Sequence, residues 1–164
     1  MYSGNNCRSK NFGRTNSSKR HSTEEEWRKI PITFTQDKYV QEAENVIKEL
    51  KDKNFKCYNK VTKKKEKDTL TTNQIRNLLS LTSTIYDETL NQGAQSVTDR
   101  LAYLRIQFVY QSGRNAAVKK LVELADILNI LSQVQQKKDK QLIIRFCHYM
   151  EALVAYFKYY GGKD

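Results

Sequence analysis

The side chains that could bind a metal or attack a substrate are few and far apart in this chain. Histidine and cysteine together occur only at His21, His148, Cys7, Cys57 and Cys147. There is no C-x-x-C pair, and His148 with Glu151 forms a lone His-x-x-Glu without the further carboxylates of a di-iron helical bundle. These spacings predict no metal site, no disulfide framework and no bound cofactor.

Motifs that carry enzyme chemistry are equally absent from the sequence. It holds no Walker-type glycine loop, no nucleophile elbow and no paired acidic motif. The scattered, odd number of cysteines is typical of a reducing compartment. The start MYSGNNCRSKNFGRT lacks the apolar core of a signal peptide, and no stretch approaches the roughly 18 apolar residues of a membrane span. We therefore expect a cytoplasmic protein that is not an enzyme and does not span a membrane.

Binding to a polyanion is the function that the composition favours. The chain has 29 Lys and Arg against 18 Asp and Glu, a formal net charge of +11. Nucleic acid is the first candidate partner and an anionic membrane surface is the second. A membrane-bound protein would need a basic helix with an exposed apolar face, whereas the lysines here are densest in the segment 51–68. The charge pattern therefore indicates nucleic acid.

We predict a surface that holds nucleic acid through its phosphates, without reading bases. Its candidate residues are Lys60, Lys63, Lys64, Lys65, Arg76, Arg100, Arg114, Lys119 and Lys120. On the third expected helix, Arg100 and Arg114 share a polar strip beside Tyr103 and Tyr110, which suits phosphate contacts with bases or sugars resting on rings. A solvated helix face explains the same strip equally well.

Five helices and a basic tail account for the whole sequence. Residues 1–29 are rich in Ser, Asn, Lys and Arg and poor in aliphatic residues, so we expect a flexible, disordered tail, followed by one domain over 30–164. Apolar periodicity and end signals predict helices over 35–52, 71–91, 115–134 and 138–160, and a further helix that starts at Ser96 or Thr98 and ends near Gly113. Thr71 and Gln74 have the spacing of a capping box. We predict no strand, a basic loop over 51–68, and a compact all-α bundle.

The third helix, DRLAYLRIQFVYQSGR, is apolar over most of its circumference, which predicts that it is the central helix. Arg105 falls inside the apolar arc, so we expect it to be buried against a carboxylate. The candidate partners are Asp87, Glu123 and Asp126. On this interpretation, Arg105→Ala would cost about 3 to 5 kcal/mol of stability.

The last helix has a core face, which includes Phe146 and Phe157, and a mixed aromatic and basic strip beside it. The members of that strip include Arg145, His148, Tyr149, Tyr156 and Tyr159. Packing within the bundle, with tyrosine hydroxyls at the solvent edge, is one explanation. The other is a contact surface for a partner subunit, for which the candidates are Arg145, His148, Tyr156 and Tyr159.

Several stretches of the chain resemble one protein family. They are NQIRNLLSLTSTIYDETLN, DRLAYLRIQFVYQSGR and FCHYMEALVAYFKYYGGKD, with PITFTQDKYVQEAENVIKEL similar to that family's first helix. The family is the small helical subunit of the type III-A CRISPR effector, the Csm complex. The resemblance spans residues 30–164, and residues 1–29 lie outside it.

The resemblance implies an all-helical, non-catalytic subunit of a ribonucleoprotein for antiviral defence. Such subunits stack head to tail with further copies of themselves along the paired guide RNA and target RNA. Cleavage of the target belongs to the backbone subunits, and the nuclease and cyclase activities belong to the large subunit. The residues alone leave open a free-standing helical RNA- or DNA-binding regulator that works as a dimer, although no helix-turn-helix with a basic recognition helix is evident.

Overall fold

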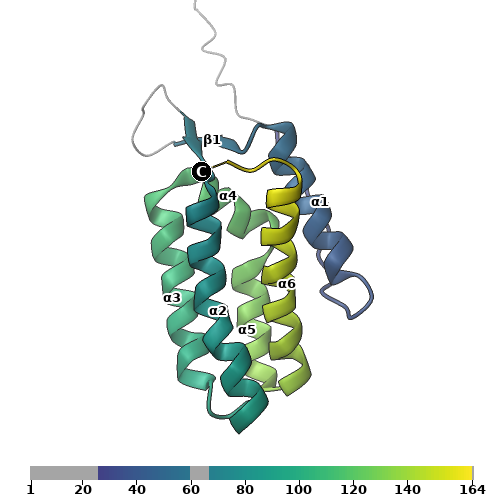
Figure 1. Ribbon diagram of the computed structural model, residues 1–164, viewed down its shortest axis with the longest axis vertical. Helices are drawn as coiled ribbons and strands as arrows, with labels where there is room; N and C mark the ends of the chain where they lie inside the picture. The colour runs from purple at the N-terminus through teal and green to yellow at the C-terminus, as the bar shows by residue number, and fades with distance from the viewer. Residues whose placement is uncertain (1–25, 60–66, 164) are drawn as a thin grey trace, which may run out of the picture.

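The chain folds into a helical bundle with a small hairpin at one end (Figure 1). The computed structural model describes residues 26–59 and 67–163. Within these ranges the helices are α1 (Tyr39–Asp52), α2 (Thr72–Gln92), α3 (Thr98–Arg114), α4 (Ala116–Leu124), α5 (Ile127–Lys137) and α6 (Lys140–Tyr159). The strands are β1 (Lys56–Tyr58) and β2 (Lys67–Thr69). The predicted all-α class is confirmed.

Side-chain caps explain where three of the helices begin. The predicted capping box is present at α2, where the Thr71 hydroxyl accepts from the Gln74 amide and the Gln74 side chain accepts from the Thr71 amide. The Asn115 side chain accepts from the first amides of α4. The Asp139 carboxylate does the same at the start of α6, where Leu142 donates over 3.0 Å. Each cap satisfies amides that have no partner within the helix.

The predicted helix over 115–134 is in fact two helices, so the prediction of five helices is wrong at this point. Asp126 adopts the left-handed conformation, with φ of 51°, and separates α4 from α5. Aspartate tolerates this conformation better than most residues because its short polar side chain bonds locally, and here it accepts from the Asn129 amide group. Apolar periodicity continues across the joint, which is why the sequence pattern does not show it.

The predicted absence of strands is also wrong, because part of the segment 51–68 forms a β-hairpin. β1 and β2 pair antiparallel, with Cys57 opposite Asp68. Phe55 and Cys57 lie two residues apart and are both buried, and the Phe55 ring packs edge-on against Phe157 of α6 at 4.8 Å. This two-residue alternation is the strand signal that the high lysine content conceals.

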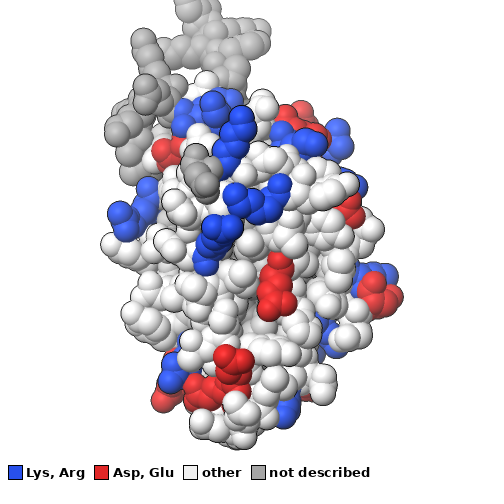
Figure 2. Space-filling view, in the orientation of Figure 1, with Lys and Arg blue, Asp and Glu red and all other residues white. Residues whose placement is uncertain are grey.

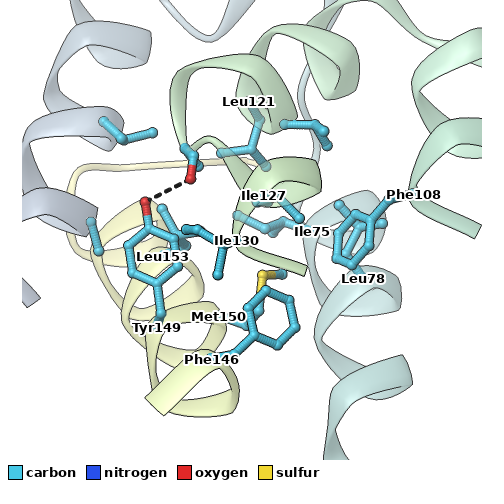
Figure 3. Packing of buried hydrophobic residues seen from close by; sticks show 14 of the residues in the cluster. Ile75, Leu78, Phe108, Leu121, Ile127, Ile130, Phe146, Tyr149, Met150 and Leu153 are labelled. Atoms are coloured by element: carbon cyan, nitrogen blue, oxygen red, sulfur yellow. Dashed lines mark hydrogen bonds between the residues drawn. The ribbon is translucent and has the colours of Figure 1, made fainter. Parts of the chain in front are cut away.

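The core lies between α6 and the helices around it. In the bundle α6 packs against α1, α2 and α5, and α3 packs against α2, α4 and α5. Figure 3 shows Phe146, Tyr149, Met150 and Leu153 of α6 meeting residues of α2, α4 and α5. The prediction that Tyr149 belongs to the outer strip of α6 is wrong, because this side chain is fully buried. Its hydroxyl donates to the carbonyl of Ala125 at the joint between α4 and α5, over 3.1 Å.

The prediction that α3 is central is wrong as well. Only Leu101, Leu104 and Phe108 of this helix are buried. On the opposite side, Ile106 is 61% exposed and Val109 is 53% exposed. The helix lies at the edge of the bundle, so it has neighbours along one side only (Figure 1). An apolar circumference therefore shows what a helix could bury, and the number of neighbouring helices decides what it does bury.

Arg105 lies on the exposed side of α3 and not in the core, so the predicted buried ion pair and its large cost are both wrong. We now expect Arg105→Ala to change the free energy of unfolding by less than about 0.5 kcal/mol, as is usual for an exposed position. Leu104→Ala, one residue away but buried, should cost about 2 to 5 kcal/mol. Urea unfolding of both variants checks this, and a loss of several kcal/mol at Arg105 would contradict it.

An extended segment, residues 26–36, lies against α1 and is held by two buried carboxylates. Glu42 accepts from the Thr33 amide at 2.8 Å, from the Thr33 hydroxyl at 2.6 Å and from the Phe34 amide at 3.0 Å. Two helical turns further along α1, Glu49 accepts from the Arg28 amide at 3.0 Å. We call residues 26–36 the N-terminal segment. Of the predicted tail over 1–29, residues 26–29 belong to this segment, and residues 1–25 lie outside the described part of the chain.

Candidate nucleic-acid interface

Four of the predicted RNA-binding residues lie toward the same end of the bundle, which we call the hairpin end. The hairpin, the start of α2, the start of α4 and the ends of α3 and α6 all lie there (Figure 1). Arg76 is in the second turn of α2, Arg114 ends α3, and Lys119 and Lys120 are in α4. Figure 2 shows more Lys and Arg side chains in the half of this face toward the hairpin end than in the other half, with acidic side chains in both halves.

The remaining predicted residues divide into two groups. Arg100 lies near the start of α3, about 20 Å from Arg114 along the helix axis, so it is at the opposite end of the bundle. It forms an ion pair with Glu88 of α2. Lys60, Lys63, Lys64 and Lys65 lie outside the described residues, in the segment that links β1 to β2. The structure therefore does not bring Arg100 to the hairpin end.

A short chain of hydrogen bonds fixes the hairpin to the start of α4. The Asp68 carboxylate of β2 accepts from the Ala116 amide at 2.8 Å and from the Asn59 side chain at 2.9 Å. Beside this junction is a cleft of about 280 Å³, lined by β1, the end of α3 and α4. Lys119 and Lys120 are among its lining residues, so two of the predicted cations face a hollow next to the hairpin.

The cations at the hairpin end differ in exposure and in how closely each one approaches a carboxylate. Lys120 is tied to Glu123, with 2.8 Å between ammonium and carboxylate, and its ammonium lies 5.5 Å from the Trp27 ring. Lys119 is more exposed and only 4.0 Å from the same carboxylate. The Arg114 guanidinium rests over the Tyr110 ring at 5.5 Å. Arg76, Arg114 and Lys119 are therefore the predicted cations best placed to meet a phosphate, since all three are exposed.

Sequence reasoning missed several cations of the same end. Lys67 of β2 places its ammonium 4.7 Å from the Tyr58 ring of β1, directly across the hairpin. A second cleft, of about 390 Å³, is lined by Lys51, Lys56 and Lys163. These lysines come from α1, from the hairpin and from the residues after α6, so only the tertiary fold brings them together. Their presence in the lysine-rich segment 51–68 was the one signal available for Lys51, Lys56 and Lys67.

The predicted partner strip on α6 includes side chains that already have contacts within the chain. Arg145 donates to the Phe34 carbonyl at 3.1 Å and to the Gln36 side chain at 3.0 Å, so it holds the N-terminal segment. The His148 ring lies 5.5 Å from the Tyr86 ring of α2. The role of these residues at a partner interface stays a prediction, and the structure adds that they also serve the fold.

The two tyrosines of the strip lie at the end of α6. Tyr159 is 79% exposed, and the half-buried Tyr156 stacks on Tyr160 at 6.3 Å. The Tyr160 hydroxyl donates to Glu44 of α1 over 2.6 Å, which raises the pKa of the tyrosine. Hydrogen bonds from Lys48 and from that hydroxyl lower the pKa of Glu44. These bonds tie the end of α6 to α1 and leave Tyr159 as the exposed aromatic of the strip.

The groups with catalytic potential are spread out or shielded in the described residues. Across 26–59 and 67–163 there is no cluster of three or more His, Cys, Asp or Glu side chains that could hold a metal ion. Burial raises the pKa of the Cys147 thiol to about 12, so this sulfur stays protonated and is a poor nucleophile. No helix in the described ranges is long and apolar enough to span a membrane.

Comparison with known proteins gives one consistent result. Residues 33–163 match the family described as Csm2 Type III-A. The chain is 47% identical over 131 residues to the CRISPR system Cms protein Csm2 of Streptococcus thermophilus, which covers 80% of this chain and 98% of that protein. It is 42% identical over 137 residues to the protein of the same name from Mycobacterium tuberculosis, covering 81% of this chain and 99% of that one. The chain therefore belongs to the Csm2 family, the small subunits of the type III-A CRISPR Csm complex.

Proposed function

We propose that this chain is a non-catalytic small subunit that stacks with copies of itself and holds the guide RNA and target RNA duplex through its phosphates. Its other partners are the backbone subunits and the large subunit of the complex, and the assembly acts in the cytoplasm in antiviral defence. The observation that carries the proposal is the gathering of exposed cations at the hairpin end, from α2, α3, α4 and the hairpin. Membership of the Csm2 family supports the other Csm subunits as partners.

The types of side chain at the hairpin end favour backbone contact over base recognition. Arg76, Arg114 and Lys119 are exposed and come from three different helices, so they form a broad charged surface and not a single recognition helix. The segment that joins β1 to β2 adds Lys63, Lys64 and Lys65 in sequence. Contacts of this kind fix the position of RNA and carry no sequence information.

Cleavage of RNA is assigned in this proposal to other subunits. The described residues supply cations and aromatic rings at the hairpin end, and the buried Cys147 has its pKa raised to about 12. Tyr159, with its 79% exposure, is the side chain of α6 that we propose for contact with a neighbouring subunit.

Replacing Arg76, Arg114 and Lys119 together with alanine should weaken binding of the full-length chain to RNA. Each lost phosphate contact should lower the slope of log affinity against log salt by about 0.7, so the triple variant should lose about 2 in slope. The same loss should appear with two RNAs of unrelated sequence, because phosphates are common to both. Titrations at several salt concentrations measure the slope.

The matched control is Arg100→Ala, which removes an arginine at the far end of α3 that is already paired with Glu88. It should leave the salt slope nearly unchanged. If the triple variant lost affinity for only one of the two RNAs, the surface would read bases and the proposed mode of binding would be wrong. An unchanged slope in the triple variant would place the RNA on another surface.

A further inference from the structure

The outer side of α3 carries a second apolar row that is exposed in the described part of the chain. Its members, Ala102, Ile106, Val109 and Gly113, are spaced by four, three and four residues, and we call them the outer seam. Ile106 is 61% exposed, and a Cβ added at Gly113 would meet nothing within 4 Å. This spacing is that of a helix that packs against another helix. The inner side of α3 has its own row and already meets the bundle.

The residues beside the outer seam follow a symmetric order. Asp99, Tyr103, Tyr110 and Arg114 lie along one flank, separated by four, seven and four residues. Tyr103 is 60% exposed and Tyr110 is 57% exposed. The order is acidic, aromatic, aromatic and basic, so a copy that runs in the opposite direction presents its basic end to the acidic end of the first. The flank is therefore complementary to itself when two helices are antiparallel.

We infer that a second copy of this chain binds the outer seam, with the two α3 helices antiparallel. Ile106 lies at the centre, next to the twofold axis. Asp99 of each copy faces Arg114 of the other, and Tyr103 of each faces Tyr110 of the other. Such a contact uses the same surface on both chains and closes at two copies, so it differs from head-to-tail stacking, which continues from chain to chain. The pair is a state of the protein outside the stack.

The chemistry of the seam fits this occupant better than RNA. Its centre is Ile106 and Val109, which offer nothing to a phosphate, and one end of the flank carries the carboxylate of Asp99. The contact spans about 15 residues of one helix on each side, which is roughly 22 Å. A contact along one helix of this length buries less surface than the minimum of about 1,200 Å² in standard complexes. We therefore expect a weak pair that forms at high protein concentration.

Charge reversal tests the pairing directly, using full-length protein treated with nuclease so that RNA does not occupy Arg114. Sedimentation equilibrium should show a monomer and dimer in balance for the unchanged protein, at concentrations up to about 1 mM. Asp99→Arg and Arg114→Asp should each weaken the dimer about tenfold or more, because each variant places like charges at both ends of its own pair. An equimolar mixture of the two variants should restore dimers, because the mixed pair joins opposite charges at both ends.

Two further variants distinguish dimer formation through the outer seam from nonspecific association. Ile106→Glu should abolish the dimer and leave the monomer folded, because this side chain is mostly exposed. Leu90→Ser, which replaces an exposed apolar residue of α2 outside the seam, should leave the dimer unchanged. The inference is wrong if the protein stays monomeric up to about 1 mM, if Ile106→Glu has no effect, or if the mixture is no tighter than each variant alone. A monomer that binds RNA through Tyr103 and Tyr110 would assign the seam to nucleic acid.

Discussion

Replacing Tyr149 with alanine should lower the free energy of unfolding by about 4 kcal/mol, the range expected for removing a large buried ring. Tyr149 is fully buried, and its ring meets the Phe34 ring edge-on at 5.7 Å. Its hydroxyl donates to the Ala125 carbonyl at the joint between α4 and α5 (Figure 3). The substitution therefore removes core packing and a buried hydrogen bond together. Urea unfolding followed by circular dichroism measures the loss.

Tyr149→Phe separates the two contributions. The ring stays, and only the bond to Ala125 is lost, so the expected cost is about 1 to 2 kcal/mol for a buried carbonyl without its partner. Tyr159→Ala, on the same helix but exposed, should cost less than about 0.5 kcal/mol. Equal effects for Tyr149→Ala and Tyr159→Ala would mean that the ring of Tyr149 is not in the core.

Replacing Glu42 with alanine should cost about 3 kcal/mol, because hydrogen bonds to a charged group contribute more than neutral ones. Its carboxylate accepts three bonds from Thr33 and Phe34, and Phe34 is buried. Without the carboxylate, the amides of the N-terminal segment lose their partner and the segment loses its attachment to α1. Denaturant unfolding gives the stability. Limited proteolysis within residues 26–36 should become faster.

The matched control is Gln41→Ala, an exposed neighbour on α1, which should change neither stability nor proteolysis. Glu42→Gln should fall between the two, because its amide keeps one acceptor oxygen but turns a donor toward the donors of the segment. If Glu42→Ala behaved like Gln41→Ala, the carboxylate would not hold the segment.

The helices could be predicted where local chemistry determines them. The Thr71 and Gln74 capping box marks the start of α2 and Gly93 directly follows its end, so each signal lies within a few residues of the boundary that it predicts. The joint at Asp126 could not be predicted, because apolar periodicity continues across it and the hydrogen bond to the neighbouring Ala125 carbonyl comes from Tyr149 of a distant helix. The hairpin could not be predicted for a different reason. Lysines stand between its apolar residues, and the high lysine content of the segment 51–68 indicated a basic loop.

Burial was harder to predict than helicity. A helical wheel gives the relative directions of side chains, but not how many neighbours the helix has. Ile106 and Val109 are apolar and Tyr149 is amphipathic, yet the first two are exposed and the third is fully buried. The candidate RNA surface shows the same limit. The sequence identified Arg76, Arg114 and Lys119 by charge, whereas the proximity of Lys163 to Lys51 arises from the docking of α6 on α1.

The position of α6 has a consequence for synthesis on the ribosome. α6 is the packing partner of both α1 and α2, and it follows them in the chain by more than one intervening helix. Domains fold during synthesis only when the residues that complete them have emerged. The apolar faces of α1 and α2 that pack against α6 therefore remain exposed until α6 has been synthesised. Until then the nascent chain exposes Val46, Ile47, Ile75 and Leu78, and it is in this interval that chaperones would find a binding site.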